Sequence, residues 1–291
     1  MKDKVIKLVW EVPASISGIM LREFLRVEKQ VSRKLLAEVK FRGGKLEINE
    51  AEASVNAILK PTDKVTITLP AEDVSGNIIP AFHPLVKLYE DEHVLVIDKP
   101  PHLPVLPMTD RLKPSVSGAI LYDYIQNRWP ATVHIVTRLD RDTSGVMLIA
   151  KHRYAHSLLF AAQHRGEVRR SYRAQVKGEF PWAAVSIHVP IARKPTSNVE
   201  REPFSKGQKA VSHVKCLKKA DISELRISLE TGRTHQIRVH MNWLGFPVAG
   251  DTLYGEVEKG FSRQALHAEE IIFPHPISGE QITVSAAPEF T

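Results

Sequence analysis

Hydrophobic residues recur at helical spacing near the start of the chain, and then at the period of two that is typical of strands. Apolar positions over residues 21–25 fall on one face of a helix, and Ser32 is a favourable N-cap for a second helix over residues 33–39. Alternating stretches at 45–48 and 65–69 predict two short strands after that helix. The first part of the chain is therefore expected to form a small α/β unit.

The remainder of the chain has the strand content of one larger domain. Residues 71–86 mix glycine, asparagine and proline, and we interpret them as a linker. Unbroken apolar runs are typical of strands buried on both faces, and alternation is typical of half-buried strands. After the linker, two apolar runs, one helical pattern and two alternating stretches lie at 94–97, 146–149, 154–164, 172–176 and 225–229. This mixture predicts an α+β fold.

Composition narrows the functional class. The 291 residues carry a net charge of +7, which favours a polyanionic partner, although many soluble proteins are mildly basic. The single cysteine, Cys216, excludes an internal disulfide and a four-cysteine zinc site, and His235 and His240 are too far apart for a zinc-binding helical pair. The sequence shows no signal peptide, no membrane-spanning run of about 18 apolar residues and no phosphate-binding glycine loop. We expect a cytoplasmic protein with no metal and no nucleotide cofactor.

Basic residues are concentrated at the N-terminal end. The first 70 residues hold 13 Lys and Arg against 9 Asp and Glu, which is more than half of the net charge. The basic residues on or just after the two predicted helices are Arg22, Arg26, Arg33, Lys34, Lys40 and Arg42. Composition alone leaves a polyanion-binding surface and a solvated charged face equally open.

Two polar clusters adjoin predicted strands. Residues 138–145 place two carboxylates, two guanidinium groups and two hydroxyls just before an apolar run, although Asp, Thr, Ser and Gly are also ordinary turn residues. Residues 231–240 follow another strand, and Thr234 is expected to cap a helix there. The buried face of that helix would comprise Ile237, Met241 and Leu244, and the polar face His235, Arg238 and Asn242. Arg and His near a helix start fit a buried carboxylate or a phosphate.

These segments resemble, in order, the signature elements of the RluA/RluC/RluD-type RNA pseudouridine synthases. RLDRDTSGVMLIAK at 138–151 resembles the family's Arg-Leu-Asp-x-x-Thr-Ser-Gly signature and its apolar strand. The other matching elements are DEHVLVIDKPPHLPV (91–105), RRSYRAQVKGE (169–179), TGRTHQIRVHM (231–241), GDTLYG (250–255) and RQALHAEEIIFPHP (263–276). Residues 21–25, 32–36 and 46–49 resemble the S-four-like RNA-binding module, two helices plus a β-hairpin, that many members carry in front. Asn49-Glu50-Ala51 departs from the module's usual Asn-Gly turn, so the turn type stays open.

The resemblance implies a domain organisation and an activity. It implies an S-four-like module over residues 1–70, the linker 71–86, and a catalytic domain over residues 87–291. That domain would be α+β, with a long mixed, mainly antiparallel sheet, flanking helices and a central cleft. The activity would be RNA pseudouridine synthesis, in which uracil leaves its ribose and rejoins it through a carbon. Such an isomerisation requires no cofactor.

Residue roles follow from the same resemblance. Asp140 would be the essential carboxylate, acting either as a nucleophile at the sugar or as a base that gives a glycal. A carboxylate buried alone would lose its charge, so an opposed arginine, Arg238 rather than Arg233, would keep it ionised. Stacking on the target base, lining the uracil pocket and inserting into the RNA beside the flipped base would fall to Tyr172, Leu266 and Arg138. Plain core packing is the alternative for the first two of these.

The implied partner is a structured RNA bound by a monomer, with large-subunit ribosomal RNA favoured over transfer RNA. RNA contacts are expected from a basic loop over residues 192–209, from Arg233, and from Arg22, Arg33, Lys34 and Arg42. Two other functions remain open. One is a non-catalytic RNA-binding or ribosome-assembly factor of the same fold. The other is a hydrolase that cleaves glycosidic bonds with Asp140 and Asp142.

Overall fold

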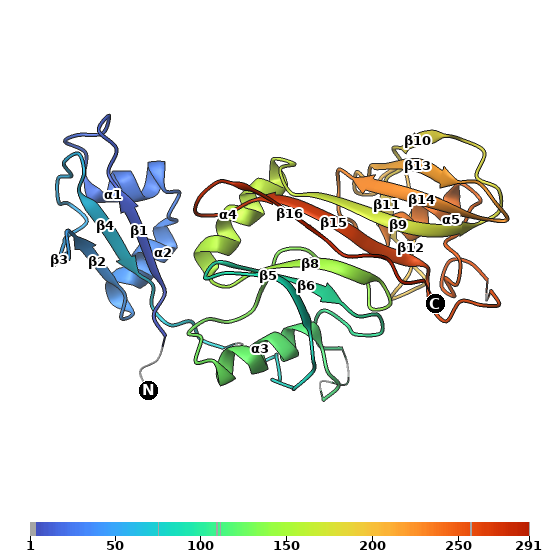
Figure 1. Cartoon of the computed structure of the whole chain (residues 1–291), viewed down its shortest axis with the longest axis horizontal. Coiled ribbons are helices and arrows are strands. Elements are labelled where there is room, and N and C mark those ends of the chain that lie inside the picture. Colours follow the sequence, from blue (N-terminus) through green and yellow to red (C-terminus); the bar gives the residue numbers. More distant parts are fainter. Residues whose placement is uncertain (1–3, 75, 109, 111, 257, 291) are drawn as a thin grey trace.

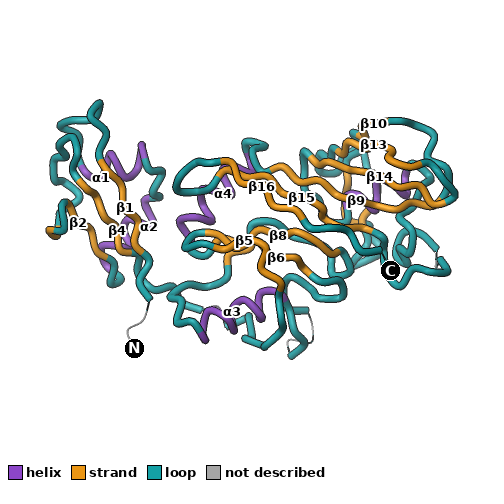
Figure 2. Tube along the Cα trace, in the orientation of Figure 1, coloured by secondary structure: helices purple, strands orange, loops and turns teal. Residues whose placement is uncertain are grey.

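Two sheets follow one another along the long axis of the molecule (Figure 1). The structure is a computed structural model that describes residues 4–74, 76–108, 110, 112–256 and 258–290. The small N-terminal sheet has the strand order β1-β4-β2-β3, and the large sheet has the order β10-β13-β14-β9-β15-β8-β6-β5. Helices flank both sheets (Figure 2). Within the described ranges no helix is long and apolar enough to cross a membrane.

The N-terminal part contains β1 (Lys7–Glu11), α1 (Leu21–Glu23), η1 (Phe24–Glu28), α2 (Arg33–Phe41), β2 (Lys45–Ile48), β3 (Ala51–Glu52) and β4 (Lys64–Thr68). The start of α2 is confirmed, because the Ser32 hydroxyl accepts a hydrogen bond from the Leu35 N–H at 3.1 Å. The first predicted helix is one α-helical turn that continues as the π-helical turn η1. The sequence pattern missed β1, which pairs with β4 and completes a four-stranded sheet.

The tight turn between β2 and β3 settles the question left open by Asn49-Glu50. Both residues have positive φ, 50° and 68°, which is the pattern of a type I′ turn. Glu50 therefore adopts a left-handed conformation in which glycine is usual.

The large sheet and its surroundings contain β5 (Val86–Glu90), β6 (Val94–Lys99), α3 (Val116–Gln126), β7 (His134–Ile135), β8 (Ser144–Ala150), α4 (Arg153–His164), β9 (Arg169–Lys177), β10 (Ala184–Ile187), β13 (Ser212–Lys218), β14 (Ile222–Leu229), α5 (Gln236–Trp243), β15 (Leu266–Pro274) and β16 (Gln281–Ser285). The pair β11 (Ile191–Arg193) and β12 (Arg201–Pro203) forms a separate hairpin. Strand β8 pairs parallel with β15, and the other neighbours pair antiparallel. The expected mixed, mainly antiparallel sheet is thus confirmed.

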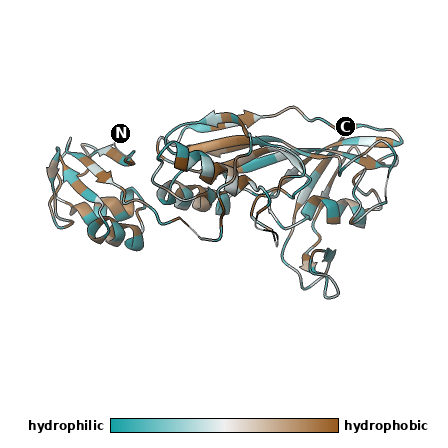
Figure 3. Ribbon diagram, turned by 90° about the horizontal axis from the view of Figure 1, so that it is seen from below, coloured by the Kyte–Doolittle hydropathy of each residue, from teal (hydrophilic) through white to brown (hydrophobic). Residues whose placement is uncertain are grey.

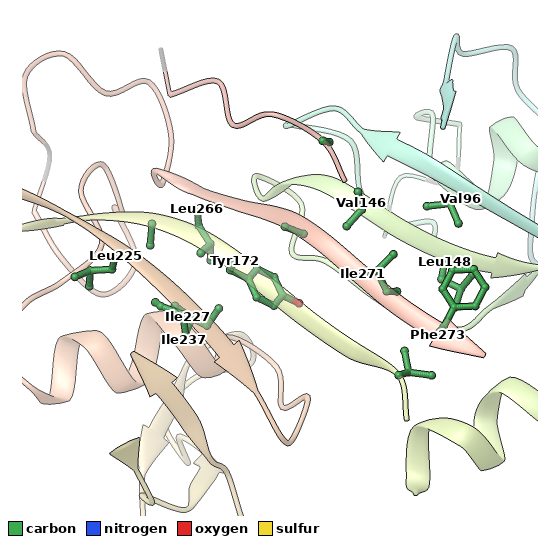
Figure 4. Packing of buried hydrophobic residues seen from close by; sticks show 14 of the residues in the cluster. Val96, Val146, Leu148, Tyr172, Leu225, Ile227, Ile237, Leu266, Ile271 and Phe273 are labelled. Carbon is green, nitrogen blue, oxygen red and sulfur yellow. The ribbon is translucent and has the colours of Figure 1, made fainter. Parts of the chain in front are cut away.

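Strand β8 is covered on both faces, and its residues 146–150 are all apolar. Val146 and Leu148 pack in one core cluster with Leu159 of α4, whereas Met147 and Ile149 pack in another cluster. That second cluster contains several residues of α3. Figure 3 shows apolar residues on the strands of the large sheet, and Figure 4 shows part of the first cluster. The unbroken run at 146–149 was therefore interpreted correctly.

The segment interpreted as a linker is partly fixed in place. Glu72 is buried and accepts a hydrogen bond from His134 at 2.6 Å. Its carboxylate also pairs with Arg153 of α4, which forms a further ion pair with Glu38 of α2. Tyr154 of α4 lies in the N-terminal core cluster. The N-terminal part and the large sheet therefore share buried contacts.

Candidate active site

The loop that carries Asp140 is anchored at both ends. At its start, the Thr137 hydroxyl accepts a hydrogen bond from the Leu148 N–H at 2.9 Å. At its end, Gly145 has a φ of +110° and lies against β15. A Cβ atom at this position would lie 2.2 Å from the Ala268 carbonyl oxygen. Only glycine therefore allows β8 and β15 to approach closely enough to pair.

Side chains from distant segments hold the middle of this loop. Arg263 donates to the Asp142 carbonyl oxygen at 3.3 Å and to the Ser144 hydroxyl at 3.0 Å. Gln264 donates to the Thr143 hydroxyl at 2.8 Å. Both side chains are buried. They were missed by the sequence analysis, although both belong to the RQALHAEEIIFPHP element, just before β15.

Arg238 lies between two carboxylates. Its Nη1 atom is 3.3 Å from Oδ2 of Asp140, while Nε and Nη2 donate to Asp251 at 2.7 and 2.8 Å. Asp251 is almost fully buried, with 1% exposure, and it also accepts from the backbone N–H groups of Leu253 and Tyr254. Burial alone would lower the pKa of Arg238, but Asp251 and Asp140 raise it overall. The guanidinium therefore stays charged, and its Nη1 atom faces Asp140.

The sequence analysis gave no role to Asp251. Arg233, the alternative partner that it named for Asp140, does not form an ion pair with Asp140. Arg233 is exposed and donates through Nε to the Lys209 carbonyl oxygen. The signal for Asp251 was the GDTLYG element, which was noted only as part of the resemblance.

One expectation for the helix over residues 236–243 was wrong. Thr234 is not the cap: the N-cap is His235, with a left-handed φ of 57° and no side-chain capping bond. On the predicted polar face Arg238 is buried, which fits an arginine that meets a buried carboxylate, whereas Asn242 is exposed. Helix α5 is enclosed on several sides: Ile237 belongs to the main core cluster, and Val239 packs in another cluster with Ile191 of β11.

The N-cap residue His235 contacts both Tyr254 and the surroundings of Asp140. His235 hydrogen-bonds through Nδ1 to the Tyr254 hydroxyl at 2.8 Å, and its Nε2 lies 3.9 Å from Asp140 Oδ1. Tyr254 also accepts from the Arg201 N–H at 2.7 Å, and its ring lies 5.0 Å from the Arg238 guanidinium carbon. The hairpin β11–β12 is thereby connected to the Asp140 environment.

A narrow cavity of about 50 Å³ brings the predicted residues together. Asp140, Tyr172, Arg238 and Leu266 all line it, with Ile237 as a further apolar wall. Tyr172 and Leu266 come from the neighbouring strands β9 and β15 (Figure 4). Burial raises the pKa of Tyr172, so its hydroxyl stays protonated. The cavity adjoins a wider groove of about 640 Å³ that Asp140 also lines.

The predicted basic contacts fall into two groups. Arg138 and Arg233 are exposed at the rim of the narrow cavity. The expected loop 192–209 is in part a β-hairpin, and its residues Arg193, Arg201 and Lys206 line a hollow of about 480 Å³ that also includes Arg233. The other group is exposed on the N-terminal part: Arg22, Arg33, Lys34 and Arg42. No cluster of three His, Cys, Asp or Glu side chains suited to a metal ion occurs among the described residues.

Comparison with known proteins identifies the family. Residues 93–243, just over half of the chain, match the RNA pseudouridylate synthase family. The chain belongs to the RNA pseudouridine synthases.

Two curated relatives extend the match. The uncharacterized RNA pseudouridine synthase YjbO of Bacillus subtilis is 46% identical over 89% of this chain and 92% of its own length. The ribosomal large subunit pseudouridine synthase D of Pseudomonas aeruginosa is 34% identical over 94% of this chain and 90% of its own. Among solved structures, human RNA pseudouridylate synthase domain containing 1 has a similar fold, with a TM-score of 0.57 and 24% identity over 70% of this chain and 83% of that one.

A buried lysine supports the loop of the synthase that carries Asp140. Lys99 is fully buried and donates to three carbonyl oxygens, those of Pro100, Leu103 and Arg141, at 2.7, 3.0 and 2.9 Å. Three acceptors match the three donors of an ammonium group. Burial nevertheless lowers the pKa of Lys99 to about 7.

This pKa predicts a pH dependence of stability. Between pH 7 and 10.5 the unfolded chain retains a proton on Lys99 that the folded chain has released, so the contribution of Lys99 to the free energy of unfolding increases with pH. The difference in this free energy between the wild type and Lys99→Met should rise by at most about 1.4 kcal/mol per pH unit. Urea denaturation at pH 7, 8 and 9 measures it, and parallel pH curves for the two proteins would contradict the assignment.

Asp251→Asn tests the buried pair. The substitution keeps the side-chain shape but removes the charge that Arg238 faces, and uncompensated burial of one partner costs about 3–5 kcal/mol. We expect a loss of that size in the free energy of unfolding, together with a fall in kcat. Asp221→Asn, at an exposed position, serves as the control and should change stability by less than about 0.5 kcal/mol. An unchanged stability of Asp251→Asn would show that Asp251 does not hold Arg238.

Proposed function

We propose that this synthase isomerises uridine in a structured RNA, most of all large-subunit ribosomal RNA, with Asp140 as the essential carboxylate. The observation that carries the proposal is the position of Asp140. Its side chain is 23% exposed, contacts Arg238, and lines the same cavity as Tyr172 and Leu266. The ribosomal substrate rests on relatives named ribosomal large subunit pseudouridine synthase D, of which that of Pseudomonas aeruginosa spans 94% of this chain.

The geometry supports separate roles for the residues around the cavity. A uridine that leaves its stack would place its base against the Tyr172 ring and between the apolar walls formed by Leu266 and Ile237. These walls exclude water from the broken glycosidic bond and retain the free uracil while it turns. Asp140, in contact with Arg238, would act at the ribose, by attack at the sugar or by proton abstraction. Arg138, exposed at the rim, would occupy the space that the base leaves.

The hydrolase alternative has little support in the geometry. Its second carboxylate would have to be a protonated general acid. Burial raises the pKa of Asp142, but ion pairs with Arg141 and His102 outweigh burial and lower it. Asp142 is therefore ionised at neutral pH and engaged with its own neighbours.

Asp140→Asn tests both reaction and substrate. The variant should form no pseudouridine, because the amide can neither attack the sugar nor accept a proton, while RNA affinity stays within about twofold. Pseudouridines are mapped by carbodiimide-dependent reverse-transcription stops in ribosomal and transfer RNA from cells lacking the gene and complemented with either form. Stops restored by wild type alone establish the site.

Two outcomes would contradict the proposal. Stops restored by Asp140→Asn would remove Asp140 from catalysis. A pattern that is unchanged when the gene is deleted would favour the non-catalytic RNA-binding factor.

The N-terminal residues 1–70 are proposed to be an S-four-like module that anchors the RNA. Arg33 and Lys34 begin α2 and are both exposed. Replacing both by Ala should weaken RNA binding and reduce the slope of log affinity against log salt by about 1 to 2, because up to two phosphate contacts are lost. Turnover at saturating RNA should not change.

The matched control is the exposed pair Lys218 and Lys219 at the end of β13. Equal salt slopes for both double variants would argue against an RNA-binding module. Substitution is preferable to removal of residues 1–70, because Tyr154 and Ala131 lie in the N-terminal core cluster and would lose their cover.

A further inference from the structure

A second cavity adjoins the Asp140 pocket, between α4 and β9. It has a volume of about 180 Å³ and is lined by Val136, Arg138, Leu139, Asp140, Gln163, Arg170, Tyr172, Leu229, Gly232, Arg233 and Thr234. Asp140 and Tyr172 line both cavities, so the two spaces share a wall. Three guanidinium groups border this cavity against one carboxylate. That carboxylate, Asp140, already has a partner in Arg238.

The three arginines of this cavity lack carboxylate partners. Within the described part of the chain, none of Arg138, Arg170 and Arg233 lies within ion-pair distance of an acidic side chain. The Nε atom of Arg170 is buried and has no hydrogen-bond acceptor. Arg173, on the same strand, also has a buried Nε atom without an acceptor, but its two Nη atoms pair with Glu224 and Glu269. Acidic side chains of the large sheet thus neutralise Arg173, whereas Arg170 has no acidic partner and lies beside the Asp140 pocket.

The position of the Arg170 guanidinium depends on a glycine. A Cβ atom on Gly232 would lie 2.9 Å from Nη1 and 3.1 Å from Nη2 of Arg170. The guanidinium therefore rests against the Gly232 backbone, in space that any other residue would fill. Arg170 and Tyr172 are two residues apart on β9, so their side chains lie on the same face of the sheet and line the same cavity.

We propose that this cavity binds a backbone phosphate of the RNA strand next to the target uridine, with Arg170 as the principal anion ligand. The proposal deepens the proposed function and rests on it. A guanidinium presents two parallel N–H donors that match two phosphate oxygens, and a half-buried guanidinium without an acidic partner is free to bind one. Because the two cavities share Asp140 and Tyr172, a nucleotide with its base in the first can place a flanking phosphate in the second.

The test measures equilibrium binding, so that it requires no turnover. The probe is a 5′-fluorescein-labelled single-stranded RNA of twelve uridines, titrated by fluorescence anisotropy at several KCl concentrations against variants in the Asp140→Asn background. Arg170→Ala should weaken affinity about tenfold and reduce the slope of log affinity against log salt by about 0.7, the value for one phosphate of a single strand. Gly232→Ala should weaken affinity at least threefold, because the added Cβ displaces the guanidinium without removing it.

Arg169→Ala is the matched control. Arg169 is the exposed neighbour on the same strand, and its side chain points to the other face. Its affinity should stay within twofold of the parent and its salt slope should not change.

Two results would overturn the proposal. An unchanged salt slope in Arg170→Ala would mean that Arg170 only positions Tyr172. Equal losses in Arg170→Ala and Arg169→Ala would mean that the effect is one of net charge. Failure of the proposed function is seen separately, as pseudouridine formation by Asp140→Asn in the mapping experiment.

Discussion

The active site depends on one guanidinium group held between two carboxylates. Asp251 fixes Arg238 with two hydrogen bonds in a buried position, and this leaves one edge of the guanidinium for Asp140. A buried arginine without such a partner would be strongly destabilising. The pair with Asp251 thus holds the guanidinium charge beside Asp140, in a cavity whose walls include Tyr172 and Leu266.

The carboxylate can be held there because its loop is rigid. The parallel pairing of β8 with β15 requires the close approach that Gly145 allows, and it brings Arg263 and Gln264 onto the loop. Lys99 holds the opposite side through the Arg141 carbonyl oxygen. Polar groups that are buried and fully bonded define one conformation of a turn, which is what the role proposed for Asp140 requires.

Arginines have two different environments in this fold. Arg173 and Arg238 are paired with acidic side chains and contribute to the structure, whereas Arg138, Arg170 and Arg233 surround a cavity next to Asp140. A protein that binds an anionic polymer needs charges that its own carboxylates do not neutralise. The distribution of paired and unpaired arginines therefore separates the scaffold from the surface expected to meet RNA.

The sequence by itself determined what depends on neighbours along the chain. It gave the capped helix at Ser32, the strand buried on both faces at 146–149, and a motif order that indicated the family. Strand β1, the burial of Arg238 and the partner Asp251 came only from the tertiary structure. The reason is physical: a cap or an alternating strand is set within a few residues, whereas a strand partner, the covering of a helix and the match between buried charges arise between segments far apart in the chain.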